Sequence, residues 1–193
     1  MSEKVCLISG VGPGTGAALA RRFAEGGYTV AMLARNQERL SELEAEIDGS
    51  KGYVCDVSDE DAVNATVAEV VATQGQPEIL LHNAVRGTFG NFLEMKPADL
   101  NVNFQINTMG FLYLARAVAP AMIEAGHGVI IASGNTSAQR GKPDFAGFAP
   151  TKAAQRILAE SMARELGPKG VHVAYVLIDA VIDLEWTRKM MGD

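Results

Sequence analysis

Short apolar runs alternate with amphipathic segments along most of the chain. The apolar runs predict strands at residues 5–10, 28–34, 52–57, 78–84, 128–133 and 171–178. Segments of helical periodicity between them predict helices at 15–25, 36–47, 58–75 and 97–124, and a last helix that contains Lys152 and ends near Leu166. This alternation is typical of βαβ units. The sequence therefore predicts an α/β fold: a doubly wound, Rossmann-like parallel sheet between two helical layers, as a single domain over residues 1–193.

Three of the helices carry more specific expectations. Ser58 is expected to cap the helix that follows it, with Asp61 three residues later in the manner of a capping box. The helix at 97–124 is long enough that we expect a bend in it. On the last helix, residues at helical spacing predict one apolar face, formed by Ala154, Ile157, Leu158, Met162 and Leu166.

A glycine-rich segment, SGVGPGTG at 9–16, joins the first strand to the first helix. Gly10 permits a tight turn, while Gly14 and Gly16 permit close approach of a pyrophosphate and close packing of the helix. The helix that opens at Thr15 offers its free N–H groups to phosphate oxygens. The four residues are therefore cofactor-binding candidates; the alternative is an ordinary flexible loop. The segment lacks the GxxxxGK[ST] pattern, which argues against a nucleoside triphosphatase.

Arg35 ends the second strand, about twenty residues beyond the glycine-rich segment. An acidic residue at this place would bind a ribose 2′-hydroxyl, whereas a guanidinium can meet a 2′-phosphate. The sequence thus favours NADP over NAD, although NAD stays open. The alternative reading of Arg35 is a solvated surface charge.

Composition narrows the choice of partners and compartment. The net charge is −6, 21% of residues are charged and 48% are hydrophobic, as in soluble globular proteins. Nucleic acid and anionic membranes are therefore not expected as partners, and no apolar run approaches the ~20 residues that cross a bilayer. The first residues show no signal-peptide pattern, so a cytoplasmic protein is expected. Cys6 and Cys55 lie in apolar runs as reduced thiols; a disulfide is the disfavoured alternative, and no metal site is expected.

Six motifs in order resemble those of the short-chain dehydrogenase/reductase family. They are SGVGPGTG, ARN at 34–36, CDVSD at 55–59, LHNA at 81–84, Asn107 in the long helix, and FAPTK at 148–152. The resemblance covers nearly the whole chain. It implies a Rossmann-like fold that binds NADP or NAD, hydride transfer to or from a small carbonyl or alcohol, and assembly as a homodimer or homotetramer.

The resemblance also implies roles for cofactor-binding residues. Asp56 matches the residue that meets the adenine, and Asn83 with Ala84 matches the turn after the fourth strand. His82 and Val85 depart from the family pattern at that turn, which puts its close packing in question. Lys152 matches the lysine that binds the nicotinamide ribose.

The catalytic positions match less evenly. Asn107 fits the helix asparagine of the family's proton relay, whereas Asn135 stands at the serine position, with Ser133 and Ser137 on either side. Phe148 stands at the position of the tyrosine that moves a proton in this family. After the sixth strand, Asp179-Ala180 replaces the usual Pro-Gly, and the chain ends at Asp193 before the family's last strand, so a short or truncated C-terminal part is expected.

Phe148 has no proton to give, so a substitute donor is needed. Lys152 is the preferred substitute, because it follows Phe148 by one helical turn and burial can lower the pKa of an amine toward neutrality. Tyr113, Asp144 and His82 are less favoured. The simplest alternative is that Phe148 is only a core aromatic that walls an apolar pocket with Phe145.

Three functions remain open at this point. The first is an NADP(H)-dependent oxidoreductase with an altered proton donor. The second is a catalytically impaired nucleotide-binding protein that acts as a redox-responsive or scaffolding partner. The third is a non-redox lyase or isomerase on the same fold, against which the intact glycine-rich segment argues.

Overall fold

The computed structural model describes residues 4–184 and 187–189. The strands are β1 (Val5–Ser9), β2 (Thr29–Ala34), β3 (Ser50–Val54), β4 (Pro77–His82), β5 (Gly128–Asn135) and β6 (Val171–Ile178). The α-helices are α1 (Thr15–Glu25), α2 (Gln37–Glu46), α3 (Glu60–Gln74), α4 (Pro97–Phe104), α5 (Gly110–Ala125) and α6 (Ala149–Leu166). Three short helices complete the list: η1 (Gln105–Met109), η2 (Thr136–Ala138) and η3 (Gly167–Lys169).

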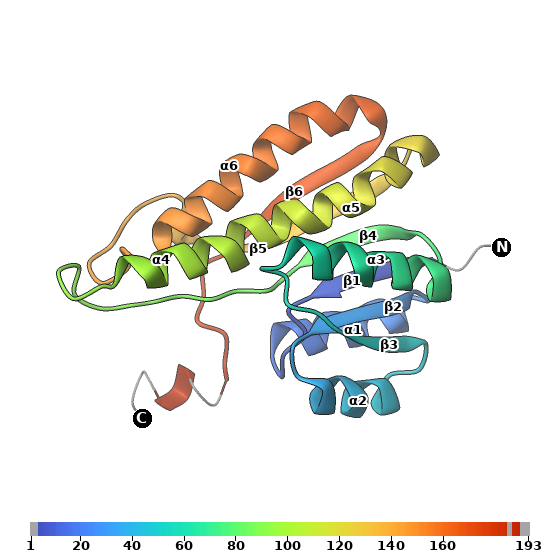
Figure 1. Cartoon of the computed structure of the whole chain (residues 1–193), viewed down its shortest axis with the longest axis horizontal. Coiled ribbons are helices and arrows are strands. Elements are labelled where there is room, and N and C mark those ends of the chain that lie inside the picture. Colours follow the sequence, from blue (N-terminus) through green and yellow to red (C-terminus); the bar gives the residue numbers. More distant parts are fainter. Residues whose placement is uncertain (1–3, 185–186, 190–193) are drawn as a thin grey trace.

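The strands form one parallel sheet in the order β3-β2-β1-β4-β5-β6. Helices α1 and α2 cover one face of this sheet, and α3, α5 and α6 cover the other (Figure 1). Alternate residues of β1 enter the two cores: Val5 and Leu7 face α3 and α5, while Cys6 and Ile8 face α1 and α2. The predicted doubly wound fold is confirmed, and its chain reversal lies between β1 and β4. In such sheets, ligands bind at this point, beyond the carboxyl ends of the strands.

Several predicted boundaries are wrong by one to three residues. Strand β4 ends at His82, two residues early, and β5 continues to Asn135, two residues beyond its predicted end. Strand β3 ends at Val54, because Asp56 leaves the sheet to accept hydrogen bonds from the backbone N–H and the hydroxyl of Ser58. Ser58 is therefore not the cap of α3. Asp59 is the cap, since its carboxylate accepts hydrogen bonds from the backbone N–H groups of Asp61 and Ala62.

The long helix is continuous but irregular. Between α4 and α5, residues Gln105–Met109 form a π-helical turn, η1, where the sequence suggested only a bend. The helix at Pro97–Ala125 is long and apolar enough to cross a membrane, with 44% of its apolar window buried. Its buried side chains, including those of Phe111 and Leu114, pack against the sheet, so the packing of a core helix accounts for its hydropathy.

Helix α6 buries the predicted face only in part: Leu158 and Met162 pack against the core as predicted, but the buried face also includes polar residues. Ile157 is 50% exposed, whereas Thr151, Lys152 and Gln155 are buried. The reason is that the first turns of α6 face the polar groups of η1 rather than an apolar surface. Leu166 is buried as predicted.

Candidate functional site

The β1–α1 loop packs tightly against the end of β4. Gly10 has a φ of +74°, and a Cβ atom on it would lie 2.3 Å from the backbone nitrogen of Ala84. The side chain of Asn83 donates a hydrogen bond to the carbonyl of Gly10 at 3.0 Å. The turn is therefore closely packed despite the unusual His82 and Val85, contrary to the doubt raised by the sequence.

The same loop leaves the N-terminus of α1 open. Gly14 is the N-cap residue and has no side chain with which to cap the first N–H groups. A Cβ on Gly16 would lie 2.5 Å from the carbonyl oxygen of Gly10, so glycine is needed there for the helix to approach the loop. Gly12 has open space around it, and Leu184 lies against Gly14. Thr15 begins the helix. Free N–H groups beside bare backbone fit the pyrophosphate of a dinucleotide.

Arg35 and Asp56 lie close together, beyond the carboxyl ends of β2 and β3. Arg35 is exposed, and its charge acts on Asp56. Burial acts to raise the pKa of Asp56, but hydrogen bonds from Ser58 and the charge of Arg35 outweigh it, so this pKa lies below its usual range. A carboxylate and an accessible guanidinium thus stand at one end of the open loop.

Lys152 is almost completely buried, with 2% of its surface exposed. Its Nζ donates hydrogen bonds to the carbonyl of Ser133, at 2.9 Å, and to Oε1 of Gln155. It also lies 5.9 Å from the ring centre of Tyr175. Burial lowers the pKa of Lys152 to about 7, because the charged amine is deprived of water.

Asn107 contributes through both its side chain and its backbone. The side-chain amide accepts from the backbone N–H of Arg86 and donates to the Arg86 carbonyl and to Thr151 Oγ1, each at 2.8 Å. Its backbone carbonyl accepts from Nε2 of Gln155 at 2.6 Å. Asn107 is therefore linked to Lys152 by way of Gln155, while its own side chain holds the backbone of the loop after β4.

Phe148 lies in an aromatic cluster with Phe89 and Phe145. Its ring centre is 5.1 Å from that of Phe89 and 6.5 Å from that of Phe145. Phe148 is 6% exposed, and a Cβ atom on Gly87 would lie only 2.9 Å from Cδ2 of its ring. The described contacts of this ring are apolar. A hydroxyl on it would need a new partner in a tightly packed place.

Asn135 ends β5 and caps η2. Its Oδ1 accepts from the backbone N–H of Ser137 at 3.1 Å, and its backbone N–H donates to the Tyr175 hydroxyl at 3.4 Å. Ser133 contributes its carbonyl to Lys152, and Ser137 is buried. The amide nitrogen of Asn135 is thus the polar group that this position adds to the site.

The less favoured proton donors are poorly suited. His82 is fully buried and hydrogen-bonded to Ser9 at 2.9 Å, and burial together with the charge of Lys152 lowers its pKa to about 3. It is therefore neutral near pH 7. Asp144 is exposed on a loop with a φ of 65°, and Tyr113 packs against the core of α3 and α5.

Sequence reasoning missed two residues around Lys152. Gln155 follows Lys152 by three residues on the same helix face, but this spacing alone does not show that both side chains are buried. Tyr175 lies across Gly134, where a Cβ would be 2.0 Å from the Tyr175 ring. Only the tertiary structure brings these two residues together. Burial raises the pKa of Tyr175 to about 12.

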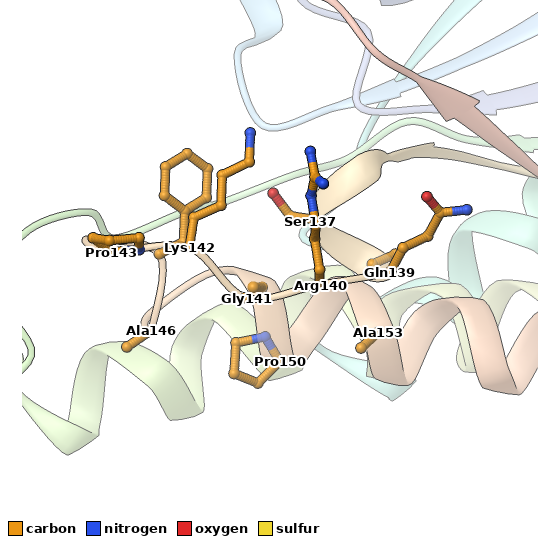
Figure 2. A pocket seen from close by; sticks show the side chains of 12 residues that line it. Ser137, Gln139, Arg140, Gly141, Lys142, Pro143, Ala146, Pro150 and Ala153 are labelled. Carbon is orange, nitrogen blue, oxygen red and sulfur yellow. The ribbon is translucent and has the colours of Figure 1, made fainter.

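A pocket of about 630 Å³ adjoins this site, between the loop after η2 and the start of α6. Figure 2 shows Pro150 and Ala153 of α6 below it, while Arg140 and Lys142 extend away from the helix. Phe145 lines the pocket, but Phe148 and Lys152 do not. The sequence suggested that Phe145 and Phe148 wall one pocket together. In the structure, Phe145 lines this pocket without Phe148.

Known proteins resemble this chain in sequence and fold. Residues 4–182 match the family model for short chain dehydrogenases. Oxidoreductase UcpA of Salmonella typhimurium is 33% identical over 179 residues, which cover 90% of this chain and 67% of UcpA. A metagenomic short-chain oxidoreductase solved with NADP superposes with a TM-score of 0.88 at 33% identity, over 94% of this chain and 84% of that one. The structure of NAD+-bound xylitol dehydrogenase superposes with a TM-score of 0.92 at 30% identity, over 97% of this chain and 74% of that one.

Gly10→Ala should reduce the free energy of unfolding by about 3 kcal/mol, because the methyl group meets backbone and the positive φ becomes strained. Gly12→Ala is the matched control, since a Cβ there meets nothing within 4 Å. Urea unfolding of the two variants measures the difference. Equal losses in both would show that the loop does not pack as described.

The buried amine should make stability depend on pH. The pKa of Lys152 is about 7 when folded against an ordinary value of 10.5, so the unfolded chain binds more protons between these values. Stability should therefore rise with pH in this window, approaching about 1.4 kcal/mol per pH unit, and the full cost is present below pH 7. Lys152→Met should lack this increment in urea unfolding from pH 7 to 10. Lys142→Met, at an exposed lysine, should retain it.

Proposed function

Because this chain belongs to the short-chain dehydrogenase family, we propose that it is an NADP(H)-dependent oxidoreductase that acts on a small carbonyl or alcohol. The observation that carries the proposal is the buried Lys152 amine, which bonds to a carbonyl near the carboxyl end of β5 and has a pKa near neutrality. The amine lies at the same end of the sheet as the glycine-rich loop, the end where the carboxyl termini of the strands meet. A titratable amine and a loop suited to a dinucleotide, placed at the same end of the sheet, suit hydride transfer coupled to proton transfer.

The cofactor would be held by residues already described. The N–H groups at the start of α1 would receive the pyrophosphate, with Gly10, Gly14, Thr15 and Gly16 keeping the backbone accessible. Arg35 would meet the 2′-phosphate of NADP. Further contacts would come from Asp56 at the adenine, Asn83 at the turn after β4, and Lys152 at the nicotinamide ribose. The bound cofactor would supply or accept the hydride.

Proton transfer would fall to Lys152. In the reductive direction, the substrate carbon gains the hydride, and the substrate oxygen takes a proton from the Lys152 ammonium, which becomes a neutral amine. A pKa of about 7 allows both forms at neutral pH. Asn135 would donate a hydrogen bond to the same oxygen through its amide. Asn107 would act indirectly, by fixing the surroundings of Lys152.

Tyr175 is a less suitable donor, although it is the phenol near Lys152. Nζ of Lys152 faces its ring rather than its hydroxyl, and burial raises its pKa to about 12. An ammonium near a phenol oxygen would have lowered that pKa. The phenol is therefore expected to hold its proton.

A second function is favoured by one observation, the apolar packing of Phe148 at the tyrosine position. On this account the chain binds the nucleotide but has little catalytic activity. In either case we propose a cytoplasmic homodimer or homotetramer. The exposed apolar side chains of Phe92 and Leu93, which are adjacent in the loop before α4, suit a contact between subunits.

The proposal is tested by titrating the protein with NADPH and NADH and assaying a panel of aldehydes and ketones for cofactor oxidation. Lys152→Met should lower kcat by ~10²–10⁴-fold, as expected for loss of a general acid. Tyr175→Phe should change it by less than about threefold, and Lys169→Met, at an exposed lysine of η3 outside the pocket, serves as the matched lysine control. NADPH binding without turnover in either the wild type or Phe148→Tyr would favour the second function. Failure to bind either nucleotide would exclude both.

Arg35→Ala should weaken NADPH binding by about 10–100-fold and leave NADH binding nearly unchanged. The reason is the loss of charge-assisted hydrogen bonds to a 2′-phosphate that NADH lacks. Fluorescence titration with each nucleotide measures the ratio. Arg22→Ala, at an exposed arginine of α1, should leave both affinities unchanged. Equal weakening of the two nucleotides by Arg35→Ala would mean that Arg35 does not select the phosphate.

A further inference from the structure

A buried side-chain amide joins the lysine to the π-helical turn. Nε2 of Gln155 donates to the carbonyl of Asn107 at 2.6 Å, and Oε1 of Gln155 accepts from Nζ of Lys152. Gln155 is fully buried. We propose that Gln155 is a positioning residue that keeps the Lys152 amine in its protonated, donating form by bridging it to the Asn107 carbonyl. The role of that form in catalysis rests on the proposed function, but the bridge itself does not.

The partners fix the orientation of the amide. A backbone carbonyl only accepts hydrogen bonds, so Asn107 requires the NH₂ group of Gln155 on its side. The amide oxygen must then face Lys152, where it favours an N–H donor. A flipped amide would set two oxygens against each other at Asn107. The bridge thus holds the negative end of the amide dipole against the amine, which stabilises the ammonium more than the neutral amine because a hydrogen bond from a charged donor is stronger.

The bridge meets the long helix within its π-helical turn, which contains Asn107. In a regular α-helix, each carbonyl accepts a hydrogen bond from the N–H four residues later. Residues Gln105–Met109 depart from that pattern, and a side chain that bonds to a helix carbonyl commonly accompanies such irregularities. Thr108 Oγ1 donates to the carbonyl of Thr151 at 3.0 Å, so η1 and α6 meet through several polar contacts. Gln155 therefore faces η1 at a point where the helix ladder changes.

Few of the described groups around Lys152 can stabilise its charge, so the hydrogen bond to Gln155 affects its protonation. Nζ has two hydrogen-bond acceptors among the described residues, the Ser133 carbonyl and Gln155, and both are uncharged. His82 of β4 is neutral and its pKa lowered, and Tyr175 of β6 presents its ring. Arg156, the next cation on α6, pairs with Glu160. Among the described side chains, no carboxylate is hydrogen-bonded to the ammonium. Dipoles alone stabilise the charge, so each acceptor matters.

The test follows the titration of Lys152 by NMR in protein labelled with ¹³C-lysine, with the ε-carbon signal assigned from its loss in Lys152→Met. Gln155→Met keeps the length of the side chain and removes both hydrogen bonds, so the midpoint should fall by about one pH unit. Gln155→Glu places a carboxylate beside the amine and should raise it. Gln76→Met, at an exposed glutamine far from the site, should leave the midpoint unchanged.

The opposite directions separate the bridge from general damage to the structure, which would move both variants the same way. An unchanged midpoint in Gln155→Met, or a shift of the same sign in both variants, would overturn the proposal. The wild type gives a test without any substitution: the side-chain amide signal of Gln155 should move with the midpoint of Lys152, and an amide signal that is flat through that pH range would also overturn it.

The titration does not depend on turnover, so it distinguishes the two proposals. If NADPH is oxidised, the pH midpoint of kcat should shift with that of the Lys152 signal in each variant. If the midpoints shift as expected but no carbonyl is reduced, the bridge stands and the oxidoreductase proposal fails. If kcat falls in Gln155→Met while its pH midpoint stays in place, Gln155 does not act through Lys152.

Discussion

Two buried amides on one helix hold the site together. Asn103 and Asn107 lie one turn apart, and both are fully buried. Asn103 donates to the carbonyl of Gly147 at 2.6 Å and accepts from the Arg86 guanidinium at 2.7 Å, while Asn107 binds the Arg86 backbone and Thr151. Buried polar groups require partners, so these bonds fix the start of α6 relative to the loop after β4. The positions of Phe148 and Lys152 follow from that constraint.

The same constraint explains why α6 buries a polar stripe. Thr151 and Gln155 bond to Asn107 of η1, and Lys152 bonds to the Ser133 carbonyl of β5, so each of the three has a polar partner. Burying an amine costs stability that apolar residues would have supplied. Helix α6 therefore contributes less apolar burial to stability than an apolar helix face would, and it forms a defined polar site instead. Such local losses of stability are common at functional sites. The sheet and its two apolar cores supply the compensating burial.

The sequence predicted the fold more fully than the site, for physical reasons. Periodicity and glycine positions report local structure, so the strands and the glycine-rich loop were found. The cap of α3 was misplaced because Ser58 and Asp59 are adjacent residues with equivalent capping chemistry. Helical periodicity found only part of the buried face of α6, since it cannot reveal that polar residues meet polar partners. Gln155 and Tyr175 gain their roles from neighbours distant in sequence, which one chain without its structure does not identify.

An apolar ring at position 148 changes what the remaining groups must do. A phenol in this position would need its own hydrogen-bond partner within the packing of Phe89 and Gly87, and Phe148 removes that demand. The buried charge beside it remains, and without a phenol to share a proton it must be satisfied by acceptors alone. The Ser133 carbonyl and the Gln155 amide fill that need. A polar residue at 155 and an apolar one at 148 are thus two parts of one arrangement: the ring packs among aromatic side chains, and the amine is held by uncharged acceptors.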